Sequence, residues 1–342
     1  MIETASSAEA LPTLADIEAA AERIRDHALR TPVLPGRGGL DAMFGATLFF
    51  KCENLQRVGA FKFRGAMNAV QQLAPAQLAR GVATHSSGNH AAALALAAQI
   101  KRVPAYVVMP EGSAKPKVDA VRNYGAQITF CANNQQAREA ALDEVVARTG
   151  ASFVHPYDDW RVICGAATAA LELFAEVGPL DMLLTPVGGG GLASGSALAC
   201  KLRPHEPHDG GPGYTPARFV AVEPENADDA ARSFATGVLQ PQLLPNTIAD
   251  GLRTALSPRT FNVLRTHADD IVTVSEASIV EAMRLLWSRL NILVEASAAV
   301  PLAALLEKKV STIGGPRIGG PRIGIILSGG NVDLDALPWQ TT

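Results

Sequence analysis

Lys62 is the residue in this sequence best suited to chemistry with a carbonyl group. It stands between Phe61 and Phe63 in the segment KCENLQRVGAFKFRGA, residues 51–66, just ahead of a predicted helix. Apolar neighbours keep water from a lysine amine, and this lowers its pKa because the charged form loses hydration. A neutral amine is what Schiff-base formation requires. The structural alternative is a lysine that extends its charge into solvent along an apolar surface.

Three further segments place small or polar residues directly after a predicted strand. In THSSGNHA, residues 84–91, the backbone N–H groups that open a helix favour an anion such as a carboxylate. Four glycines at 188–191 also open a helix, and glycine lets the backbone close around a phosphate. Neither segment is G-x-G-x-x-G or a P-loop, which disfavours a nucleotide site. SGGN, residues 328–331, indicates another loop of the site, although helix caps and plain turns would also fit such residues.

The elements that must position these segments alternate between strand and helix. The pattern predicts strands at 48–51, 82–84, 105–109, 127–130, 153–155, 182–187, 219–222 and 324–327. It predicts helices at 66–73, 88–100, 117–124, 135–149, 162–176, 192–202, 277–290 and 296–307, and an earlier one that is capped by Asp16 and reaches Leu29. Such alternation predicts an α/β fold with parallel sheets. Residues 205–216 and the tandem IGGPR at 313–324 are predicted to be loops.

Taken together, the motifs GAFKFRGA, SSGNHA, GGGG and LSGGNVDL closely resemble, in this order, the fold-type II pyridoxal-phosphate (PLP) enzymes. Within them the chain is similar to the serine racemase and threonine/serine dehydratase family, from about Ile17 to Leu337. The resemblance implies the two-lobed fold of the tryptophan synthase β type. A large PLP-binding domain would comprise residues 1–80 plus 161–342, and a small domain residues 81–160. The cofactor would lie between them.

The resemblance also implies roles for individual residues around the cofactor. Lys62 would be the Schiff-base lysine, Phe61 would pack against the pyridine ring, and Asn89 would hydrogen-bond the ring hydroxyl. The phosphate would be held by Gly188, Gly189, Gly190, Gly191 and the Leu192 amide. Ser328 would face the pyridine nitrogen. A hydroxyl there stabilises a protonated ring less than a carboxylate would, which favours elimination over transamination.

The implied reaction is removal of ammonia and water from an L-β-hydroxy amino acid such as threonine or serine, giving a 2-keto acid. Lys62 would remove the Cα proton, and the cofactor phosphate is the expected proton donor to the leaving hydroxyl. The resemblance places the substrate carboxylate among Ser86, Ser87, Asn89 and His90. It places Arg138 and Thr254 near the far end of the substrate.

A divalent-cation site is implied by the segment VEPENADD, residues 222–229, which resembles the metal site of racemase-like members. Glu223 and Asp229 would supply carboxylates, and Ala227 would supply its carbonyl oxygen. An all-oxygen set of ligands fits Mg²⁺, Mn²⁺ or Ca²⁺. Read from the residues alone, the segment is a solvated acidic loop.

Three segments depart from the family's pattern and put the shape of the pocket in doubt. Ala60 stands where many relatives have serine. CGAAT, residues 164–168, replaces A-G-Q-G-T, so that Ala167 stands where a glycine that faces the cofactor is usual. EASAA, residues 295–299, replaces E-P-[ST]-[AG]-[AG].

Rival activities remain open at this point. HPYDD, residues 155–159, resembles dehydratases, which carry an aromatic residue after H-P. Ser87 instead favours serine racemisation, because it offers a proton on the face opposite Lys62. Dehydration of 3-hydroxyaspartate or phenylserine is a further alternative. A catalytically silent ligand sensor on this fold is disfavoured because Lys62 is intact.

Composition narrows the class of protein without identifying it. The 342 residues are 48% hydrophobic and 18% charged, as expected for a globular chain. A net charge of −3 gives no reason to expect nucleic acid or an anionic membrane as a partner. The four cysteines form no C-x-x-C pair, the N-terminus lacks a signal-like apolar stretch, and no uninterrupted apolar run spans a membrane. We therefore expect a cytoplasmic enzyme with a small-molecule amino-acid substrate, assembled as a homodimer or homotetramer.

Overall fold

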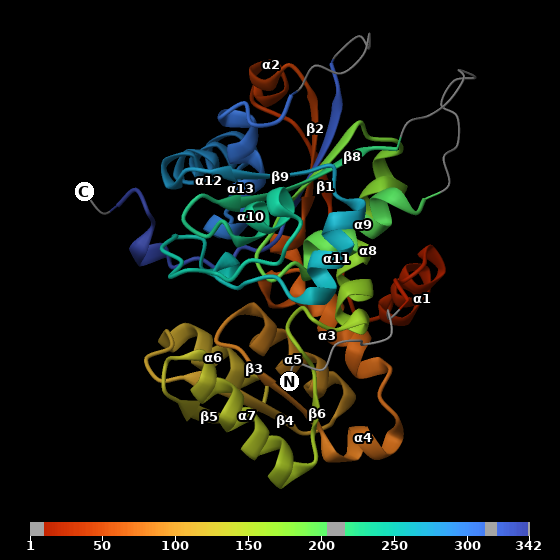
Figure 1. Ribbon diagram of the computed structural model, residues 1–342, viewed down its shortest axis with the longest axis vertical. Coiled ribbons are helices and arrows are strands. Elements are labelled where there is room, and N and C mark those ends of the chain that lie inside the picture. The colour runs from red at the N-terminus through yellow and green to blue at the C-terminus, as the bar shows by residue number, and fades with distance from the viewer. Residues whose placement is uncertain (1–9, 204–215, 312–319, 341–342) are drawn as a thin grey trace.

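The computed structural model describes residues 10–203, 216–311 and 320–340, and its chain forms two separate sheets (Figure 1). The predicted loop at 205–216 and most of the IGGPR repeat lie outside the described residues. Strands alternate with helices through most of the chain, so the predicted α/β class with parallel sheets is confirmed. Among the described residues, no helix combines the length and the hydrophobicity needed to cross a membrane.

The larger sheet has six strands in the order β1-β2-β10-β7-β8-β9. Of these described strands, β1 and β2 pair antiparallel, and the other neighbours pair parallel. In the order of the sheet the strands are β1 (Val33–Pro35), β2 (Thr47–Cys52), β10 (Arg322–Leu327), β7 (Met182–Pro186), β8 (Arg218–Pro224) and β9 (Asp270–Val274). Because β2 and β10 come from opposite ends of the chain, their pairing brings the Lys62 segment beside the SGGN segment.

The smaller sheet is entirely parallel, in the order β5-β4-β3-β6. Its strands are β5 (Gln127–Cys131), β4 (Ala105–Pro110), β3 (Val82–His85) and β6 (Ser152–Phe153). It occupies the lower part of Figure 1, apart from the larger sheet above it. All four strands fall inside residues 81–160, the segment expected to form the small domain.

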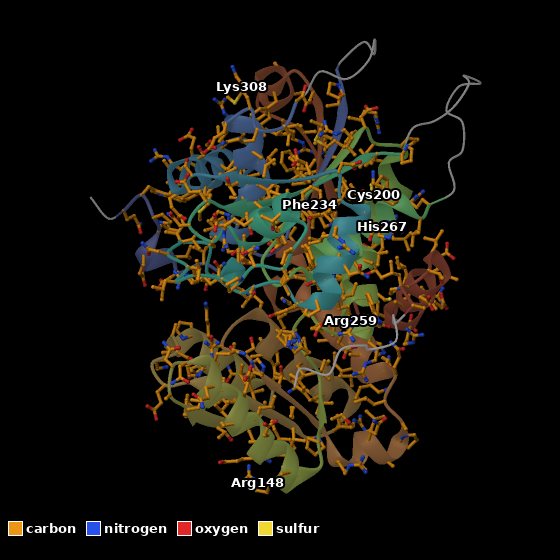
Figure 2. All side chains as sticks on the ribbon, viewed as in Figure 1. Arg148, Cys200, Phe234, Arg259, His267 and Lys308 are labelled. Carbon is orange, nitrogen blue, oxygen red and sulfur yellow. The ribbon has the colours of Figure 1, made fainter. Side chains whose placement is uncertain are left out.

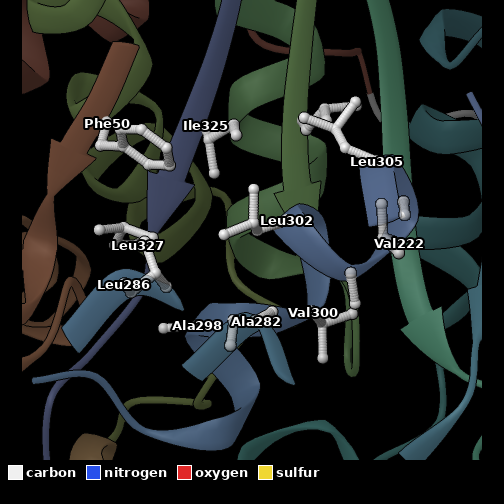
Figure 3. Packing of buried hydrophobic residues seen from close by; sticks show 14 of the residues in the cluster. Phe50, Val222, Ala282, Leu286, Ala298, Val300, Leu302, Leu305, Ile325 and Leu327 are labelled. Carbon is white, nitrogen blue, oxygen red and sulfur yellow. The ribbon is translucent and has the colours of Figure 1, made fainter. Parts of the chain in front are cut away.

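Helices cover both faces of the larger sheet. On one face Phe50, Val222 and Ile325 pack against Leu286 of α12 and Leu302 of α13 (Figure 3). The opposite face packs against α8 and α9 in a second fully buried cluster that includes Leu173, Leu183, Leu198, Phe219 and Ile326. These apolar layers explain why β7 and β8 are almost continuous hydrophobic runs, as parallel strands covered on both faces usually are.

The helices in chain order are α1 (Leu14–Ile24), α2 (Leu40–Phe44), α3 (Lys62–Gln71), α4 (Pro75–Arg80), α5 (Asn89–Lys101), α6 (Lys115–Asn123), α7 (Gln135–Thr149), α8 (Trp160–Val177), α9 (Gly191–Lys201), α10 (Asp229–Thr236), α11 (Pro258–His267), α12 (Glu276–Leu290) and α13 (Ala296–Leu306). The sequence pattern missed β1, β9, α2, α4, α10 and α11, most of which are short. Lys62 is the first residue of α3 rather than a loop residue ahead of it.

The prediction for the first helix was wrong at both ends. Thr13, not Asp16, is the N-cap: its side chain accepts a hydrogen bond from the Asp16 amide, and the Asp16 carboxylate accepts from the Thr13 amide at 2.8 Å. This reciprocal capping box satisfies two amides that the first turn would otherwise leave unpaired. The helix ends at Ile24, and the chain continues through turns toward Leu29.

Candidate functional site

The Lys62 amine is enclosed at the start of α3. Its Nζ donates a hydrogen bond to the Pro156 carbonyl oxygen at 2.9 Å and lies 5.1 Å from the centre of the Phe61 ring. Burial lowers the pKa of Lys62 to about 8, although the negative charge of Glu295 acts in the opposite direction. The residue as a whole is only partly buried, although its amine group is enclosed. A sizeable neutral fraction near neutral pH makes this amine a nucleophile and a base.

The segment SSGNHA forms the loop between β3 and α5 and continues into the first turn of α5. Ser86, Ser87 and Asn89 are half-buried there. His90 is buried, and its Nε2 donates to the Val154 carbonyl oxygen at 3.2 Å. Burial, with a further contribution from the Lys62 charge, lowers the pKa of His90 to about 3, so the ring is neutral. The loop therefore offers hydroxyl, amide and backbone donors at a helix N-terminus, where a carboxylate is favoured.

The four glycines connect β7 to α9 under tight packing. An added Cβ would lie 2.8 Å from the Leu252 Cα at Gly188 and 2.4 Å from the Tyr157 ring at Gly189. Gly190 has φ +87°, which other residues rarely adopt. Thr260 Oγ1 donates to the Gly189 carbonyl oxygen at 3.0 Å and so holds the loop from behind.

The amides of the glycine segment and Leu192 are left available for a ligand. Within the described part of the chain, none of the amides of residues 188–192 donates to another backbone group. They precede or open α9, whose dipole places partial positive charge at the same end. Free amides at a helix N-terminus can bind a phosphate. These residues therefore fit the phosphate group of PLP, the cofactor that the sequence implied.

The SGGN segment lies against the lysine segment through backbone hydrogen bonds. The Phe61 amide donates to the Ser328 carbonyl oxygen at 3.0 Å, and the Gly330 amide donates to the Gly59 carbonyl oxygen at 2.9 Å. Ser328 is buried at the end of β10. The fold therefore brings this segment next to the Lys62 segment, as the sequence predicted.

Glu295 is a site residue that the sequence reasoning named only as part of a departing motif. Its carboxylate accepts hydrogen bonds from Asn89 Nδ2 at 3.0 and 3.2 Å, and its amide donates to the Gly329 carbonyl oxygen at 3.1 Å. Burial raises the pKa of Glu295 to about 7. Asn89 Oδ1 accepts from Asn331 Nδ2 at 2.9 Å, so two loops fix the orientation of the Asn89 amide. In the sequence, Glu295 could have been recognised as a candidate site residue because it is a single acid directly before the apolar stretch ASAAVPLAALL.

Tyr157 is a second residue whose place the sequence did not reveal. Its ring packs on Gly189 and lies 4.6 Å, centre to centre, from the His155 ring. His155 Nδ1 accepts hydrogen bonds from the Asp158 and Tyr157 amides at 2.8 and 3.3 Å, and burial lowers the pKa of His155 to about 4. The HPYDD segment therefore contacts the Lys62 amine through Pro156 and the glycine segment through Tyr157. Arg259 of α11 holds its far end through a hydrogen bond to the Asp158 carbonyl oxygen at 2.7 Å (Figure 2).

Two predicted substrate residues have no hydrogen bond to the lysine site among the described residues. Arg138 lies on α7, where its Nε donates to the Asn134 carbonyl oxygen at 3.3 Å, and its charge adds to burial in lowering the pKa of His85. Thr254 is exposed in the loop between residues 252 and 258. Their roles toward a substrate remain predictions.

The predicted cation residues lie together at the end of β8. The Glu223 carboxylate accepts from the Ala231 and Ala230 amides at 2.6 and 3.3 Å, and Asp229 accepts from the Leu256 amide at 3.0 Å and from Gln242 Nε2 at 2.8 Å. Both acids and Ala227 are buried. Burial raises the pKa of Glu223 well above its ordinary range and that of Asp229 to about 6, and the Asp229 charge raises that of Glu223 further. Two neighbouring buried acids fit a cation, but within the described chain no group of three or more His, Cys, Asp or Glu residues is placed to hold a metal ion.

The site as a whole is a lysine-centred cofactor site: an enclosed, near-neutral amine, a phosphate-sized set of free amides, and polar loops on either side. This combination, on parallel sheets flanked by helices, defines the fold-type II PLP enzymes. Residues 24–329 match the family of pyridoxal-phosphate dependent enzymes, and the chain belongs to that family.

Comparison with known proteins relates the chain to several activities within this family. It is 47% identical to a β-hydroxyaspartate dehydratase from Paracoccus denitrificans, over 96% of this chain and 99% of that protein. It is 45% identical to a serine racemase from Arabidopsis thaliana, over 95% of this chain and 94% of that protein. The solved structure of a T.th. threonine deaminase superposes with a TM-score of 0.84 at 40% identity, covering 94% of this chain and 99% of that one. The predicted family and fold are confirmed, while the reaction is narrowed only to those of dehydratases and racemases.

A separate hollow of about 690 Å³ lies on the outer face of α12. It is lined by Glu281, Arg284, Leu285, Trp287, Ser288, Arg289, Asn291 and Trp339. It shares no residue with the lysine site, so its size says nothing about the chemistry.

Proposed function

We propose that this chain is a PLP-dependent dehydratase (ammonia-lyase) of an L-β-hydroxy amino acid such as threonine or serine. The observation that carries the proposal is the enclosed Lys62 amine, whose pKa of about 8 makes it partly neutral, next to a glycine segment with free amides. HPYDD supports elimination over racemisation, since it resembles dehydratases in having an aromatic residue, Tyr157, after H-P. Dehydration of 3-hydroxyaspartate is the same reaction on a longer substrate, and the Paracoccus relative supports it.

The residues that would hold PLP come from four loops. Lys62 would bind it covalently, Phe61 would pack on its ring, and the amides of Gly188, Gly189, Gly190, Gly191 and Leu192 would hold its phosphate. Asn89 would donate to the ring hydroxyl through its Nδ2 group, and Ser328 would face the ring nitrogen. When bound, PLP supplies an electron sink that stabilises negative charge at the substrate Cα.

Lys62 has the second role of a base. Its amine would remove the Cα proton of the substrate, and a pKa near the working pH suits a group that must take up and release a proton. Ser86, Ser87 and Asn89 would receive the substrate carboxylate at the start of α5, and neutral His90 supports this loop through Val154. Arg138 and Thr254 would face the far end of the substrate.

A substrate panel tests the proposal. The PLP-loaded enzyme is incubated with L-threonine, L-serine, L-threo-3-hydroxyaspartate and L-threo-phenylserine, and keto acid and ammonia are measured. We expect equal amounts of both products from at least one of the four. No keto acid from any of them would exclude a dehydratase of this class.

Serine racemisation is the second candidate, supported by the Arabidopsis relative and by Ser87 in the carboxylate loop. Racemisation needs an acid on the face opposite Lys62, whereas elimination of a good leaving group does not. We expect Ser87→Ala to remove any D-serine formation and to leave measurable elimination. D-serine as the dominant product of the unmodified enzyme would overturn the choice of dehydratase.

We also propose that Glu223, Asp229 and the Ala227 carbonyl oxygen bind Mg²⁺, Mn²⁺ or Ca²⁺. The two buried acids supply hard oxygen ligands, and a bound ion stabilises the folded state by mass action. Chelation should lower the melting temperature and activity, and added Mg²⁺ should restore both in the unmodified chain but not in Glu223→Ala. An unchanged melting temperature after thorough chelation would mean that these buried acids bind no cation and only accept hydrogen bonds from backbone amides.

We propose that the chain forms two domains, residues 1–80 plus 161–342 and residues 81–160. The substrate would bind in the cleft between them, and the two domains would close on binding. We propose a cytoplasmic homodimer or homotetramer. Light scattering of the purified chain measures the assembly, and a monomer at micromolar concentration would contradict it.

A further inference from the structure

The helix that carries Lys62 has an opposite face, and a buried set of charges holds it. Successive residues of an α-helix are about 100° apart, so Arg64 points roughly away from Lys62. Arg64 is fully buried. Its Nε and Nη2 donate to the Glu53 carboxylate at 2.7 and 2.8 Å, and its Nη1 and Nη2 each donate to the Glu172 carboxylate at 2.8 Å.

This set, the Arg64 network, consists of Lys51, Glu53, Arg64 and Glu172. Lys51 Nζ donates to Glu172 at 2.6 Å, so two cations are balanced by two anions. Nη1 also donates to Thr168 Oγ1, and Nη2 shares its hydrogens with the Leu29 carbonyl oxygen, each at 3.2 Å. Buried charges are tolerated when each is paired and hydrogen-bonded, and removing one partner is costly. The network therefore fixes one arrangement of β2, α3 and α8.

Glycines bring the same helices into backbone contact. An added Cβ at Gly165 of α8 would lie 2.6 Å from the Arg64 carbonyl oxygen, and one at Gly65 would lie 2.7 Å from that of Val162. On the other side of α8, an added Cβ at Gly195 of α9 would lie 2.6 Å from the Ile163 carbonyl oxygen and 2.8 Å from the Ala167 nitrogen. Ala167 is thus packed against α9, and the effect of the CGAAT segment on the pocket stays a prediction.

The consequence is a rigid spacing between two parts of the site. Helix α3 begins at Lys62, and α9 begins at the end of the glycine segment. Helix α8 lies between them in close contact with both. A small rotation of α3 about its axis would move the Lys62 amine relative to the phosphate-binding amides without disturbing either one locally.

We propose that Arg64 is a positioning residue, which fixes the rotation of α3 through Glu53 and Glu172 and so sets the place of the Lys62 amine relative to the glycine segment. The proposal rests on the proposed function only for the role of Lys62. A planar guanidinium can bind two carboxylates at once, whereas an ammonium on a flexible stem cannot reproduce both forks. Arg64→Lys therefore keeps the charge and loses the alignment.

The test uses the full chain carrying Arg64→Lys and measures the Lys62 amine directly. In cofactor-free protein, Lys62 is labelled with trace acetic anhydride across a pH series, and its peptide is quantified by mass spectrometry. The groups that face this amine are Glu295, His90 and His155. We expect the midpoint of labelling to move from about pH 8 in the unmodified chain toward 10.5 in Arg64→Lys, because the displaced amine gains water. In the loaded enzyme we expect kcat to fall about 10- to 100-fold with KM within about twofold, as misplacement of a reacting group predicts.

Arg322→Lys is the matched control. Arg322 lies on β10, donates to the Pro179 and Val177 carbonyl oxygens at 2.9 and 2.5 Å, and packs on Phe49 away from α3. It should lower the melting temperature and leave the labelling midpoint and kcat unchanged. Thr168→Val removes one hydrogen bond to Arg64 and one within α8 to the Gly165 carbonyl oxygen, and it serves if Arg64→Lys fails to fold; we expect a smaller shift in the same direction.

Equal midpoints and equal kcat in Arg64→Lys, Thr168→Val and the unmodified chain would overturn the proposal. The same would follow if Arg322→Lys shifted the midpoint as far as Arg64→Lys. Activity that survives in Lys62→Ala would instead defeat the proposed function, while the labelling experiment would still report on the position of the amine.

Discussion

Two groups of largely buried ionisable side chains lie on opposite sides of α3, and they differ in how far charged partners offset the cost of burial: the partners offset it at Arg64 and Glu172, although burial still lowers the pKa of Lys51. In the Arg64 network, burial alone would raise the pKa of Glu172, but hydrogen bonds and charge from Arg64 hold that pKa below its ordinary value. Around Lys62 burial prevails. It lowers the pKa of Lys62 to about 8 and raises that of Glu295 to about 7.

The difference follows from pairing. Arg64 has an acceptor for every donor, so its charge persists despite burial and favours the charge of Glu172. Among the described residues, Lys62 has one carbonyl oxygen and no ion-paired acid, so loss of hydration favours its neutral form. Groups that change protonation near neutral pH are those that can transfer protons. The same helix thus carries a fixed face and a reactive face.

The largest expected effect comes from removing the reactive amine. Lys62→Ala should lower turnover at least about 1,000-fold, because it removes both the nucleophile and the base. Keto-acid release measures the loss, and Lys115→Ala, on an exposed side chain, is the control. Near-normal ammonia release from Lys62→Ala would contradict this comparison, because it would show that the Lys62 side of α3 takes no part in the reaction.

On the fixed face, removal of one charge should cost stability rather than chemistry. Glu53→Gln removes one anion from beside Arg64, where both side chains are fully buried, and we expect a loss of about 3–5 kcal/mol in the free energy of unfolding. Urea denaturation measures it. Glu22→Gln, which breaks an exposed pair with Arg25, should cost less than about 1 kcal/mol. Equal losses of unfolding free energy in Glu53→Gln and Glu22→Gln would show that the Arg64 network stabilises the fold no more than an exposed ion pair does.

The pH dependence of stability separates the two groups further. The pKa of Glu295 is raised from 4.5 to about 7 in the folded state, so the folded chain binds more protons than the unfolded chain between these values. Stability contributed by Glu295 should therefore fall as pH rises from about 4.5 to 7, by up to about 3 kcal/mol. Lys62 is charged in both states over this window and adds no slope. Unfolding of Glu295→Gln across the same pH series should lack this decline, and an identical slope would contradict the assignment.

The smallest expected effect is electrostatic. Because the negative charge of Glu295 raises the pKa of Lys62, Glu295→Gln should lower that pKa below about 8. Labelling of the Lys62 amine across a pH series measures the shift, and the acid limb of kcat/KM should move the same way. A shift upward would mean that loss of the Asn89 hydrogen bonds had displaced the amine instead.

The fold and the cofactor loops were predictable because their signals are local. Periodicity located Gln135–Thr149 to the residue, and strand–helix alternation gave the parallel sheets. Short elements such as β1 and α2 gave no comparable signal, since three to five residues cannot show a period. Thr13 was missed as a cap because Asp16 is an equally good cap by type, and only backbone geometry separates them.

The sequence by itself determined the α/β class, the lysine at a helix start and the glycine loop, because each depends on residue types within a few positions. Only the tertiary structure decided that Glu295 contacts Asn89 across 206 residues and that Arg64 lies between two carboxylates. Whether a buried ionisable group stays charged depends on which partners the fold brings within hydrogen-bonding distance. Lys51, Lys62 and Arg64 are all basic residues of one short segment, but the fold places Lys51 and Arg64 in ion pairs and gives the Lys62 amine a carbonyl oxygen instead.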